Sequence, residues 1–176
     1  MKNNLVLIGF MGTGKTSLGK MLAAKLGCAF VDLDQKIEAD ADMSIPDIFK
    51  RFGEAHFRRL ERDAVKEVAE RRGIVIATGG GTVKDARNVQ LLKEHGLIVC
   101  LTTSIDELLN RTAVQGERPV LDRDHQSEGS RRAAIEKLLA ERQQYYSQAD
   151  YTLDTTDWSP MKLVEDIIKF VRSREP

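Results

Sequence analysis

The apolar residues of this chain fall into short runs that are separated by longer stretches of mixed polarity. The first run, from Asn4 to Phe10, is continuous and leads into Gly12-Thr13-Gly14. A run of this kind predicts a strand that is buried on both faces, as in a parallel sheet. Four later runs predict further strands: Ala29 to Val31, Ile74 to Ala77, Leu97 to Leu101 and Tyr151 to Leu153.

Between these runs the apolar positions recur at helical spacing. Leu18, Met21 and Leu22 share one face of a helix that we predict from about Lys15 to Leu26. Strands that alternate with helices are typical of parallel pairing with right-handed crossovers. We therefore predict an α/β fold of three layers, with a five-stranded parallel sheet and helices on both faces.

One stretch, from Thr112 to Ser130, lacks a clean period. It contains Gly116, Pro119 and Gly129 together with charges of both signs, which predicts a loop. In a compact domain, a loop of this length is commonly a functional lid. We expect residues 112–130 to form such a lid.

Length and composition narrow the class of protein. The 176 residues, 41% of them apolar, suffice for one domain, which we expect to span residues 1–176. Lys plus Arg and Asp plus Glu both total 27, so no overall positive field would attract nucleic acid or an acidic membrane surface. The run from Leu5 to Met11 is too short to span a bilayer and lacks an export-type cleavage signal. Cys28 and Cys100 form no C-x-x-C pair, which favours a reducing cytoplasm over a disulfide framework.

The segment from Gly9 to Thr16 has the pattern G-x-x-x-x-G-K-S/T. It stands between a predicted strand and a predicted helix, as the phosphate-binding P-loop requires. Backbone N–H groups and the helix N-terminus would surround a phosphate, Lys15 would reach the β- and γ-phosphates, and the Thr16 hydroxyl would bind Mg²⁺. The alternative is a simple glycine-rich turn, which has no need of a Lys-Thr pair. The segment therefore predicts a Mg·ATP site.

Two acids, Asp32 and Asp34, follow the second predicted strand. If the extended backbone continues, both carboxylates point to the same side of the sheet. They lie at the carboxyl edge, where ligands bind in open α/β sheets. One carboxylate near Mg²⁺ and one near an acceptor hydroxyl would suit a kinase. The alternative for Asp34 is an N-cap, with a helix that begins near Gln35.

A predicted helix from about Glu54 to Arg72 carries Arg58 and Glu61 one turn apart. A pair at this spacing can hold the guanidinium in a fixed orientation, although Arg58 alone could also be a solvated surface charge.

Gly79-Gly80-Gly81 follows the third predicted strand. Three glycines indicate either a close approach of a ligand or another backbone, or a plain flexible turn.

Two further arginines could be brought to a site by a closing segment. Arg118-Pro119 lies in the predicted lid, and Arg142 lies on a later helix, ahead of Tyr145 and Tyr146. A planar guanidinium suits both phosphate and carboxylate groups. These side chains are therefore candidates for neutralising the donor and the acceptor.

In their order along the chain, these elements resemble the shikimate kinase family over essentially the whole sequence. Some positions depart from the family pattern. Gln144 stands where a proline is often found, the segment between Pro119 and Arg142 is a few residues longer than in familiar members, and the spacing from Arg142 to Ala149 is shorter. The shared motifs are Gly-x-x-Gly-x-Gly-Lys-Thr at Gly9 to Thr16, Asp-x-Asp at Asp32 to Asp34, Gly-Glu-x-x-Phe-Arg-x-x-Glu at Gly53 to Glu61, Ala-Thr-Gly-Gly-Gly at Ala77 to Gly81, Leu-x-x-Arg at Leu108 to Arg111, Arg-Pro at Arg118-Pro119 and Glu-Arg at Glu141-Arg142.

The resemblance implies two substrate sites and a role for each candidate residue. The two arginines of the acceptor site would take the carboxylate of shikimate, and the acid and the glycines would take its hydroxyls. The segment 32–61 would include the substrate-binding segment. The expected shikimate-binding residues are Asp34, Arg58, Gly79, Gly80, Gly81 and Arg142. The expected ATP-binding residues are Gly12, Thr13, Gly14, Lys15, Thr16, Ser17, Arg111 (near adenine) and Arg118 (at the phosphates), with Thr16 and Asp32 at Mg²⁺.

The implied reaction is in-line transfer of the γ-phosphoryl group of ATP to the 3-hydroxyl of shikimate, in the pathway to chorismate and aromatic amino acids. Lys15, Mg²⁺ and Arg118 would neutralise charge, while Asp34 would orient the hydroxyl and could accept its proton. The expected partners are these two small molecules, without nucleic acid or membrane, and the expected state is a monomer. The alternatives are a P-loop kinase for gluconate or a nucleoside monophosphate, and an ATP-binding regulator without transfer activity.

Overall fold

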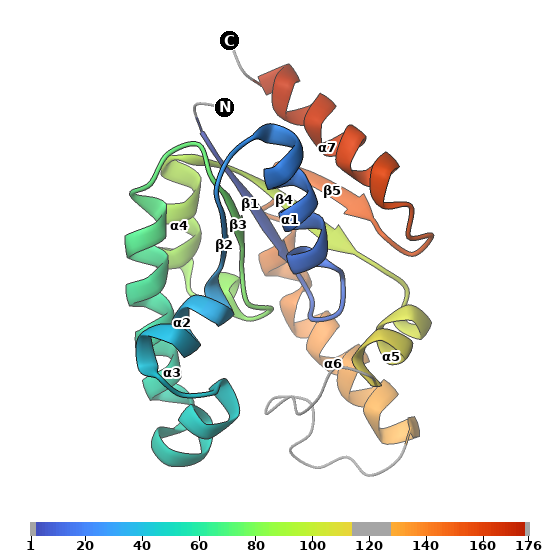
Figure 1. Ribbon diagram of the computed structural model, residues 1–176. Coiled ribbons are helices and arrows are strands. Elements are labelled where there is room, and N and C mark those ends of the chain that lie inside the picture. Colours follow the sequence, from blue (N-terminus) through green and yellow to red (C-terminus); the bar gives the residue numbers. More distant parts are fainter. Residues whose placement is uncertain (1–2, 114–127, 175–176) are drawn as a thin grey trace.

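The computed structural model describes residues 3–113 and 128–174. Its strands form one parallel sheet in the order β2-β3-β1-β4-β5, with helices on both faces (Figure 1). The predicted fold class is confirmed. The strands are β1 Asn4–Gly9, β2 Phe30–Asp32, β3 Val75–Ala77, β4 Gly96–Thr102 and β5 Tyr151–Asp154. The helices are α1 Lys15–Leu26, α2 Leu33–Ala41, α3 Ile45–Ala69, the 3₁₀ helix η1 Thr82–Lys84, α4 Ala86–Glu94, α5 Ile105–Ala113, α6 Glu128–Tyr146 and α7 Pro160–Arg174.

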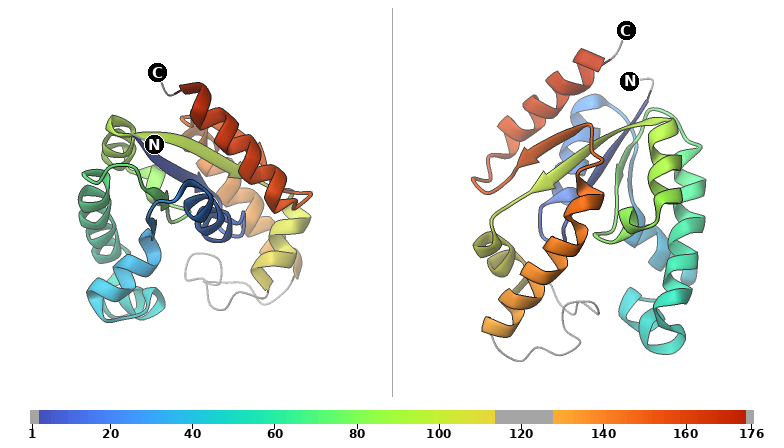
Figure 2. Two further views of the ribbon diagram at one scale, coloured as in Figure 1. Left: turned by 45° about the horizontal axis from the view of Figure 1, so that its top comes forward. Right: turned by 180° about the vertical axis from the view of Figure 1, so that it is seen from behind.

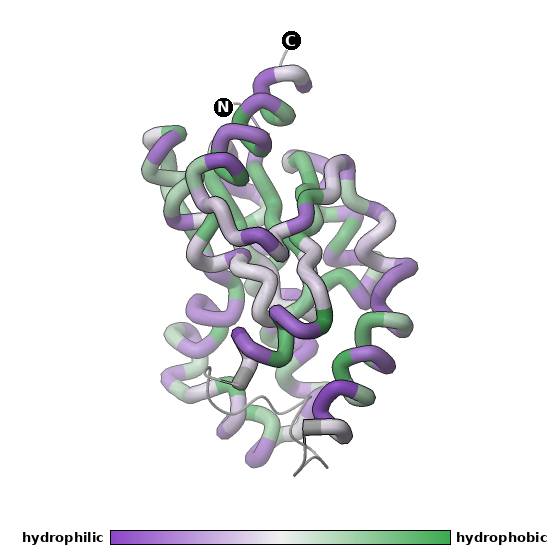
Figure 3. The backbone as a smooth tube through the Cα atoms, turned by 90° about the vertical axis from the view of Figure 1, so that its right-hand side faces the viewer, coloured by the Kyte–Doolittle hydropathy of each residue, from purple (hydrophilic) through white to green (hydrophobic). Residues whose placement is uncertain are grey.

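The central strand β1 divides the core into two layers. Leu5 and Leu7 pack in the cluster that α1 and α7 contribute to, whereas Val6 and Ile8 pack in the cluster on the opposite face with α3, α4 and α6. This alternation follows from the period of two along a strand. Figure 2 shows the two helical layers from further sides, and Figure 3 shows the apolar strands between more hydrophilic outer turns. Apolar side chains on both faces explain why the strands appear as continuous apolar runs.

Helix α1 has the bounds that the sequence predicts, but α3 is longer than predicted. It begins after Ser44, whose side chain accepts a hydrogen bond from the Asp47 N–H at 3.2 Å. Gly53 interrupts it with φ 80° and ψ 173°, which are not helical angles. The second half therefore begins at Glu54, as predicted, and it ends at Ala69 rather than at Arg72.

The extended backbone does not continue from Asp32 to Asp34, so the condition for the predicted orientation of the two acids is not met. Strand β2 ends at Asp32, and α2 begins directly afterwards at Leu33. The Asp32 carboxylate caps this helix, because its Oδ1 accepts from the N–H groups of Asp34 at 3.0 Å and of Gln35 at 3.2 Å. Asp32 rather than Asp34 is thus the N-cap, and Asp34 lies in the first helical turn. Capping of the orphan helix donors outweighs continued extension of the strand.

The sheet order places the candidate segments beside one another. Strand β1 pairs with β3, and β3 pairs with β2, all in parallel. The carboxyl ends of these strands lead into the glycine-rich loop, the triple glycine and Asp32, respectively. These three segments therefore meet at one edge of the sheet, where open α/β sheets bind ligands. Among the described residues, no helix is long and apolar enough to cross a membrane.

Candidate functional site

The segment between β1 and α1 is built to present backbone N–H groups. Gly14 caps α1 with φ 93°, and no side chain makes a cap hydrogen bond there. A Cβ atom on Gly14 would come within 2.6 Å of the Trp158 ring, so both the left-handed backbone and the close approach favour glycine. The start of α1 combines exposed donors with the positive end of the helix dipole, which is a suitable site for phosphate.

Lys15 folds back across this loop. Its ammonium donates to the carbonyl oxygens of Gly9 at 2.9 Å and Phe10 at 2.8 Å. The neighbouring Thr16 hydroxyl donates to Asp32 Oδ2 at 2.5 Å. A hydroxyl and a carboxylate side by side offer the oxygen ligands that Mg²⁺ prefers, together with phosphate oxygens. The expected metal residues Thr16 and Asp32 therefore lie together.

A single cavity of about 110 Å³ connects this loop to the acid of the acceptor site. Its lining includes Lys15 and Thr16 from the loop and Asp32 and Asp34 from the end of β2. Gly80, from the turn after β3, lines the same cavity. Residues proposed for the phosphate donor and for the acceptor therefore open onto a shared space.

The triple-glycine turn is in close contact with three of the predicted acceptor residues. A Cβ atom on Gly79 would lie 2.7 Å from Asp34 Oδ1, and one on Gly81 would lie 2.8 Å from Arg58 Nη2. A Cβ atom on Gly80 would lie 3.1 Å from Arg142 Nη1. The structure thus brings Asp34, Arg58 and Arg142 around one turn, which leaves no room for larger side chains. The alternative of a plain flexible turn does not explain these approaches.

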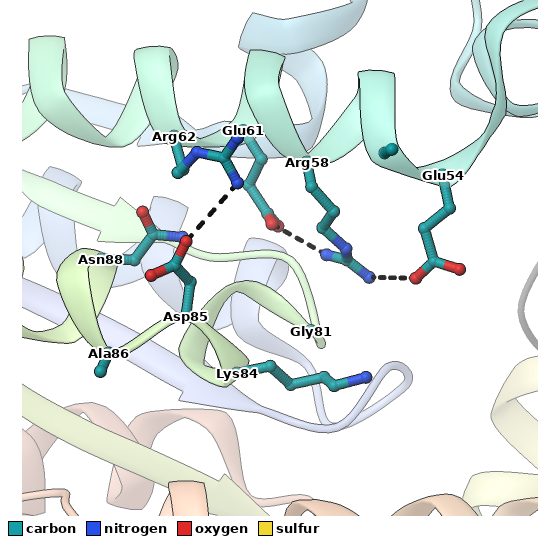
Figure 4. Close-up of a pocket in the computed structure, with 10 residues that line it drawn as sticks. Glu54, Arg58, Glu61, Arg62, Gly81, Lys84, Asp85, Ala86 and Asn88 are labelled. Atoms are coloured by element: carbon teal, nitrogen blue, oxygen red, sulfur yellow. Dashed lines mark hydrogen bonds and ion pairs between the residues drawn. The ribbon is translucent and has the colours of Figure 1, made fainter.

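Arg58 is held from both sides by carboxylates on its own helix. Its guanidinium forms ion pairs with Glu61 at 2.8 Å and with Glu54 at 3.3 Å. Burial opposes the charged form, but the two carboxylates outweigh it and raise the pKa of Arg58 above its ordinary value. Figure 4 shows Arg58 between these acids at the edge of a pocket of about 560 Å³, into which Lys84 also projects. Arg58 is therefore an oriented, half-buried cation and not a free surface charge.

Among the candidate cations that the structure describes, Arg142 is the most buried. Its side chain, on α6, is only 2% exposed, and the guanidinium lies 5.3 Å from the centre of the Phe10 ring. Among the described residues, its Nε and Nη1 atoms have no hydrogen-bond partner. Burial of a charge with open donors costs free energy unless an anion compensates for it. Arg142 beside Gly80 therefore indicates an anion-binding position.

Of the two arginines expected to contact ATP, only Arg111 lies within the described residues. Arg111 donates to the Thr155 carbonyl at 2.8 Å and to Glu107 at 3.0 Å, and it lies 5.5 Å from the centre of the Trp158 ring. Since Trp158 also contacts Gly14, Arg111 lies beside the phosphate loop. Arg118 and residues 114–127 of the predicted lid fall outside the described residues. The prediction of a loop is wrong for residues 112–113 and 128–130, which lie in helices α5 and α6.

Comparison with known proteins decides the family. The family model described as shikimate kinase matches residues 11–172. The chain belongs to the shikimate kinase family. It is 43% identical over 166 residues to a shikimate kinase from Thermodesulfovibrio yellowstonii, covering 94% of this chain and 93% of that one. It is also 43% identical to the Geobacter sulfurreducens shikimate kinase, covering 98% and 92% of the two chains.

A solved shikimate kinase structure supports the same assignment. The shikimate kinase from Acinetobacter baumannii, determined in complex with shikimate, superposes with a TM-score of 0.91 at 35% identity. The match covers 99% of this chain and 96% of that one. The shikimate kinase from Bacteroides thetaiotaomicron superposes with a TM-score of 0.89 at 32% identity. The shikimate kinase fold therefore extends over the described residues on both sides of the 114–127 gap.

Three residues of the candidate site do not follow from the sequence interpretation. The Tyr146 hydroxyl donates to the Gly80 carbonyl at 2.8 Å. Thr82 donates to Glu61 at 2.7 Å, and Trp158 packs on Gly14. Sequence signals existed for two of them, since Tyr146 lies four residues after Arg142 on the same helical face and Thr82 directly follows the triple glycine. No local pattern indicated the position of Trp158.

Proposed function

We propose that this protein is a shikimate kinase that transfers the γ-phosphoryl group of ATP to the 3-hydroxyl of shikimate, giving shikimate 3-phosphate and ADP. One structural observation supports the proposal in addition to family membership. The cavity lined by Lys15 also holds Asp34 and Gly80, and the same glycine turn touches Arg58 and Arg142. This placement of Asp34 and Gly80 beside the phosphate loop, with two cations against the same turn, supports a donor site and an acceptor site that adjoin each other. Phosphoryl transfer requires mainly this kind of positioning.

The acceptor that we propose, shikimate, is a polyhydroxy acid. The charges around the turn support its carboxylate. Arg58 and Arg142 are the two cations, and the second has open donors in a buried position. A guanidinium binds a carboxylate through two parallel hydrogen bonds, and burial makes that interaction stronger. We assign the shikimate carboxylate to these two arginines and its hydroxyl groups to Asp34 and the glycine turn.

Asp34 is the proposed acid-base residue. Its carboxylate lies against Gly79 and lines the same cavity as Lys15, between the acceptor turn and the phosphate loop. There it can orient the 3-hydroxyl toward phosphorus and accept its proton as the new P–O bond forms. Lys15 balances the charge that develops on the phosphoryl oxygens.

Magnesium is the proposed metal of the reaction. The hydroxyl of Thr16 and the carboxylate of Asp32, 2.5 Å apart, form the donor set that would hold it. When bound, Mg²⁺ would offset the negative charge of the ATP phosphates. The ATP contacts of Ser17, of Arg111 near adenine, and of the loop residues Gly12 to Gly14 stay predictions.

Arg118 remains the proposed lid cation, although it lies outside the described residues. An arginine that stabilises the transferring phosphoryl group is worth on the order of 10³-fold or more in rate. Replacing Arg118 by Ala should therefore lower kcat steeply, and a nearly normal kcat would remove Arg118 from the mechanism. A lid within residues 114–127, a single domain over 1–176, a monomeric state and a cytoplasmic location also stay predictions.

Acceptor-dependent ADP release tests the proposal. We expect Mg²⁺-dependent ADP formation with shikimate and little with gluconate or a nucleoside monophosphate. Asp34→Asn should lower kcat by about 10²-fold or more, the usual contribution of general acid-base catalysis. Asp40→Asn is the matched control, because Asp40 lies on the same helix α2 but pairs with Lys36 at the surface. Preference for gluconate would favour the rival kinase, and ATP binding without acceptor-dependent ADP release would favour a regulator.

A further inference from the structure

A chain of hydrogen bonds runs from α4 through η1 to Arg58. Asn88 Nδ2 donates to the Thr82 carbonyl at 3.0 Å. The Thr82 hydroxyl donates to Glu61 Oε1 at 2.7 Å, and Arg58 Nη1 donates to Glu61 Oε2 at 2.8 Å. Thr82 and Arg58 therefore hold the two oxygens of one carboxylate.

This carboxylate is buried, so each of its oxygens depends on a protein donor. Glu61 is 2% exposed and Thr82 is fully buried. A buried carboxylate oxygen without a donor is costly, and a carboxylate bonded at one oxygen only can rotate about its last side-chain bond. With the Thr82 hydroxyl in place, Glu61 Oε2 is fixed toward Arg58. The Thr82 hydroxyl thus fixes one of the two carboxylates that hold the Arg58 guanidinium, without touching Arg58 itself.

Thr82 is also attached to the glycine turn that faces the acceptor. Its N–H donates to the Gly79 carbonyl at 3.3 Å. Its hydroxyl oxygen lies 3.2 Å from the point where a Cβ atom on Gly79 would stand. One residue therefore connects the turn that lies against Asp34 with the acid that orients Arg58.

We propose that Thr82 is a positioning residue for acceptor binding, which acts through Glu61 to orient Arg58 toward the acceptor carboxylate. The inference rests on the proposed function, because it assumes that Arg58 binds the carboxylate of shikimate. Thr82 contacts neither the acceptor nor the phosphates in this proposal. Its loss should therefore affect affinity for the acceptor far more than the rate of phosphoryl transfer.

Thr82→Val removes the hydroxyl at nearly constant volume. We expect KM for shikimate to rise about tenfold, the effect of one hydrogen bond to a charged group. Because the phosphate loop is unchanged, kcat and KM for ATP should stay within about twofold of their values in the unsubstituted protein. Thr82→Ser keeps the hydroxyl and should restore KM to within about threefold. An unchanged KM in Thr82→Val, or a Ser variant as impaired as the Val variant, would overturn the inference.

A double-mutant cycle with Arg58→Ala tests whether Thr82 acts through Arg58. If it does, Thr82→Val should add little to the loss of kcat/KM for shikimate that Arg58→Ala already causes. If the two losses multiply, Thr82 acts by another route and the inference is wrong. If the valine variant does not fold, Thr82→Ala and Thr82→Ser answer the same question, because they leave similar cavities and differ in the hydroxyl.

Asn4→Ala controls for loss of stability. Asn4 is buried at the amino edge of the sheet. Its side chain donates a hydrogen bond to the Arg71 carbonyl at 2.8 Å and accepts one from the Ile74 N–H at 3.2 Å. This variant should be less stable than the original protein and keep its KM for shikimate. If the original protein shows no shikimate-dependent ADP release, the proposed function itself fails. If it is active and Thr82→Val is indistinguishable from it, only the present inference fails.

Discussion

Arg142 shows, at the level of one residue, a conflict between stability and binding. Its guanidinium is buried beside Phe10 and Gly80, and two of its donor nitrogens have no partner in the described part of the chain. Such a group lowers the stability of the free protein, since its hydration is lost without full compensation. An incoming carboxylate would supply the missing acceptors. Binding of the acceptor would thus recover free energy that the burial of Arg142 costs the folded protein.

Replacing Arg142 by Met tests this relation. Met fills similar space without the charge, so the melting temperature should stay equal or rise. Affinity for shikimate should fall by about 10- to 100-fold, because a charge-assisted bond to the carboxylate is lost. Calorimetric titration and thermal unfolding measure the two effects. Arg172→Met, at an exposed position on α7, is the control. A large drop in melting temperature with unchanged affinity would contradict this account of Arg142.

Tyr146 gives a prediction on pH. Burial raises the pKa of its hydroxyl from 10.0 to about 12, despite the opposing influence of Arg142. The unfolded chain therefore loses this proton at lower pH than the folded chain, and stability falls as pH rises from about 10 to about 12. Tyr146→Phe removes this titration and also the hydrogen bond to Gly80. At pH 7 we expect the Phe variant to be less stable by about 1 kcal/mol.

Denaturant unfolding of both proteins between pH 7 and pH 11.5 measures this effect. The stability difference should shrink above pH 10, because only the original protein loses the contribution of Tyr146. Cys100, whose pKa burial raises to about 11, titrates in both proteins, and in the protein with Tyr146 its charge further raises the pKa of that hydroxyl. A stability difference that stays constant over the whole range would show that Tyr146 does not titrate as described.

At the level of elements, the turn after β3 depends on the absence of side chains. Gly79→Ala would place a Cβ atom 2.7 Å from Asp34 Oδ1, so the carboxylate must move. Because Asp34 is the proposed acid-base residue, we expect kcat to fall about tenfold or more, in the range that misplaced catalytic groups show. Steady-state kinetics with shikimate measures this effect.

Gly129→Ala is the matched control for the glycine substitution. Gly129 lies in helix α6, and a Cβ atom there would meet no atom of the described residues within 4 Å. Alanine favours a helix over glycine by about 1 kcal/mol, so this variant should be at least as stable and keep its kcat. Normal kcat in Gly79→Ala would mean that Asp34 can move without loss of function.

Local patterns decided which elements could be predicted from the sequence. The strands and α1 were predictable because apolar runs and helical periods are properties of neighbouring residues. The backbone after β2 could not be decided, since Asp32 can either continue a strand or cap a helix and the sequence does not show which is more stable. The helical segment from Ile45 that precedes Gly53 was missed. A glycine near a helical pattern does not show whether a helix lies on both sides of it.

At the level of the whole molecule, the grouping of candidate segments follows from parallel topology. In a parallel sheet every strand ends at the same edge, so the segments after β1, β2 and β3 had to lie near one another. The contacts between distant parts could not be derived in this way. Tyr146 and Gly80 are separated by 66 residues, and no pattern near either one indicates the other. The burial of Arg142 depends on the same packing of α6.

Trp158 is the single tryptophan of the chain, and it packs on Gly14 while remaining 38% exposed. The protein therefore carries an intrinsic optical reporter at the mouth of its phosphate loop. The fluorescence emission of this indole would report nucleotide binding in real time, without an added label and without turnover of substrate. The same position makes acrylamide quenching a direct measure of how far a bound nucleotide shields that mouth from solvent.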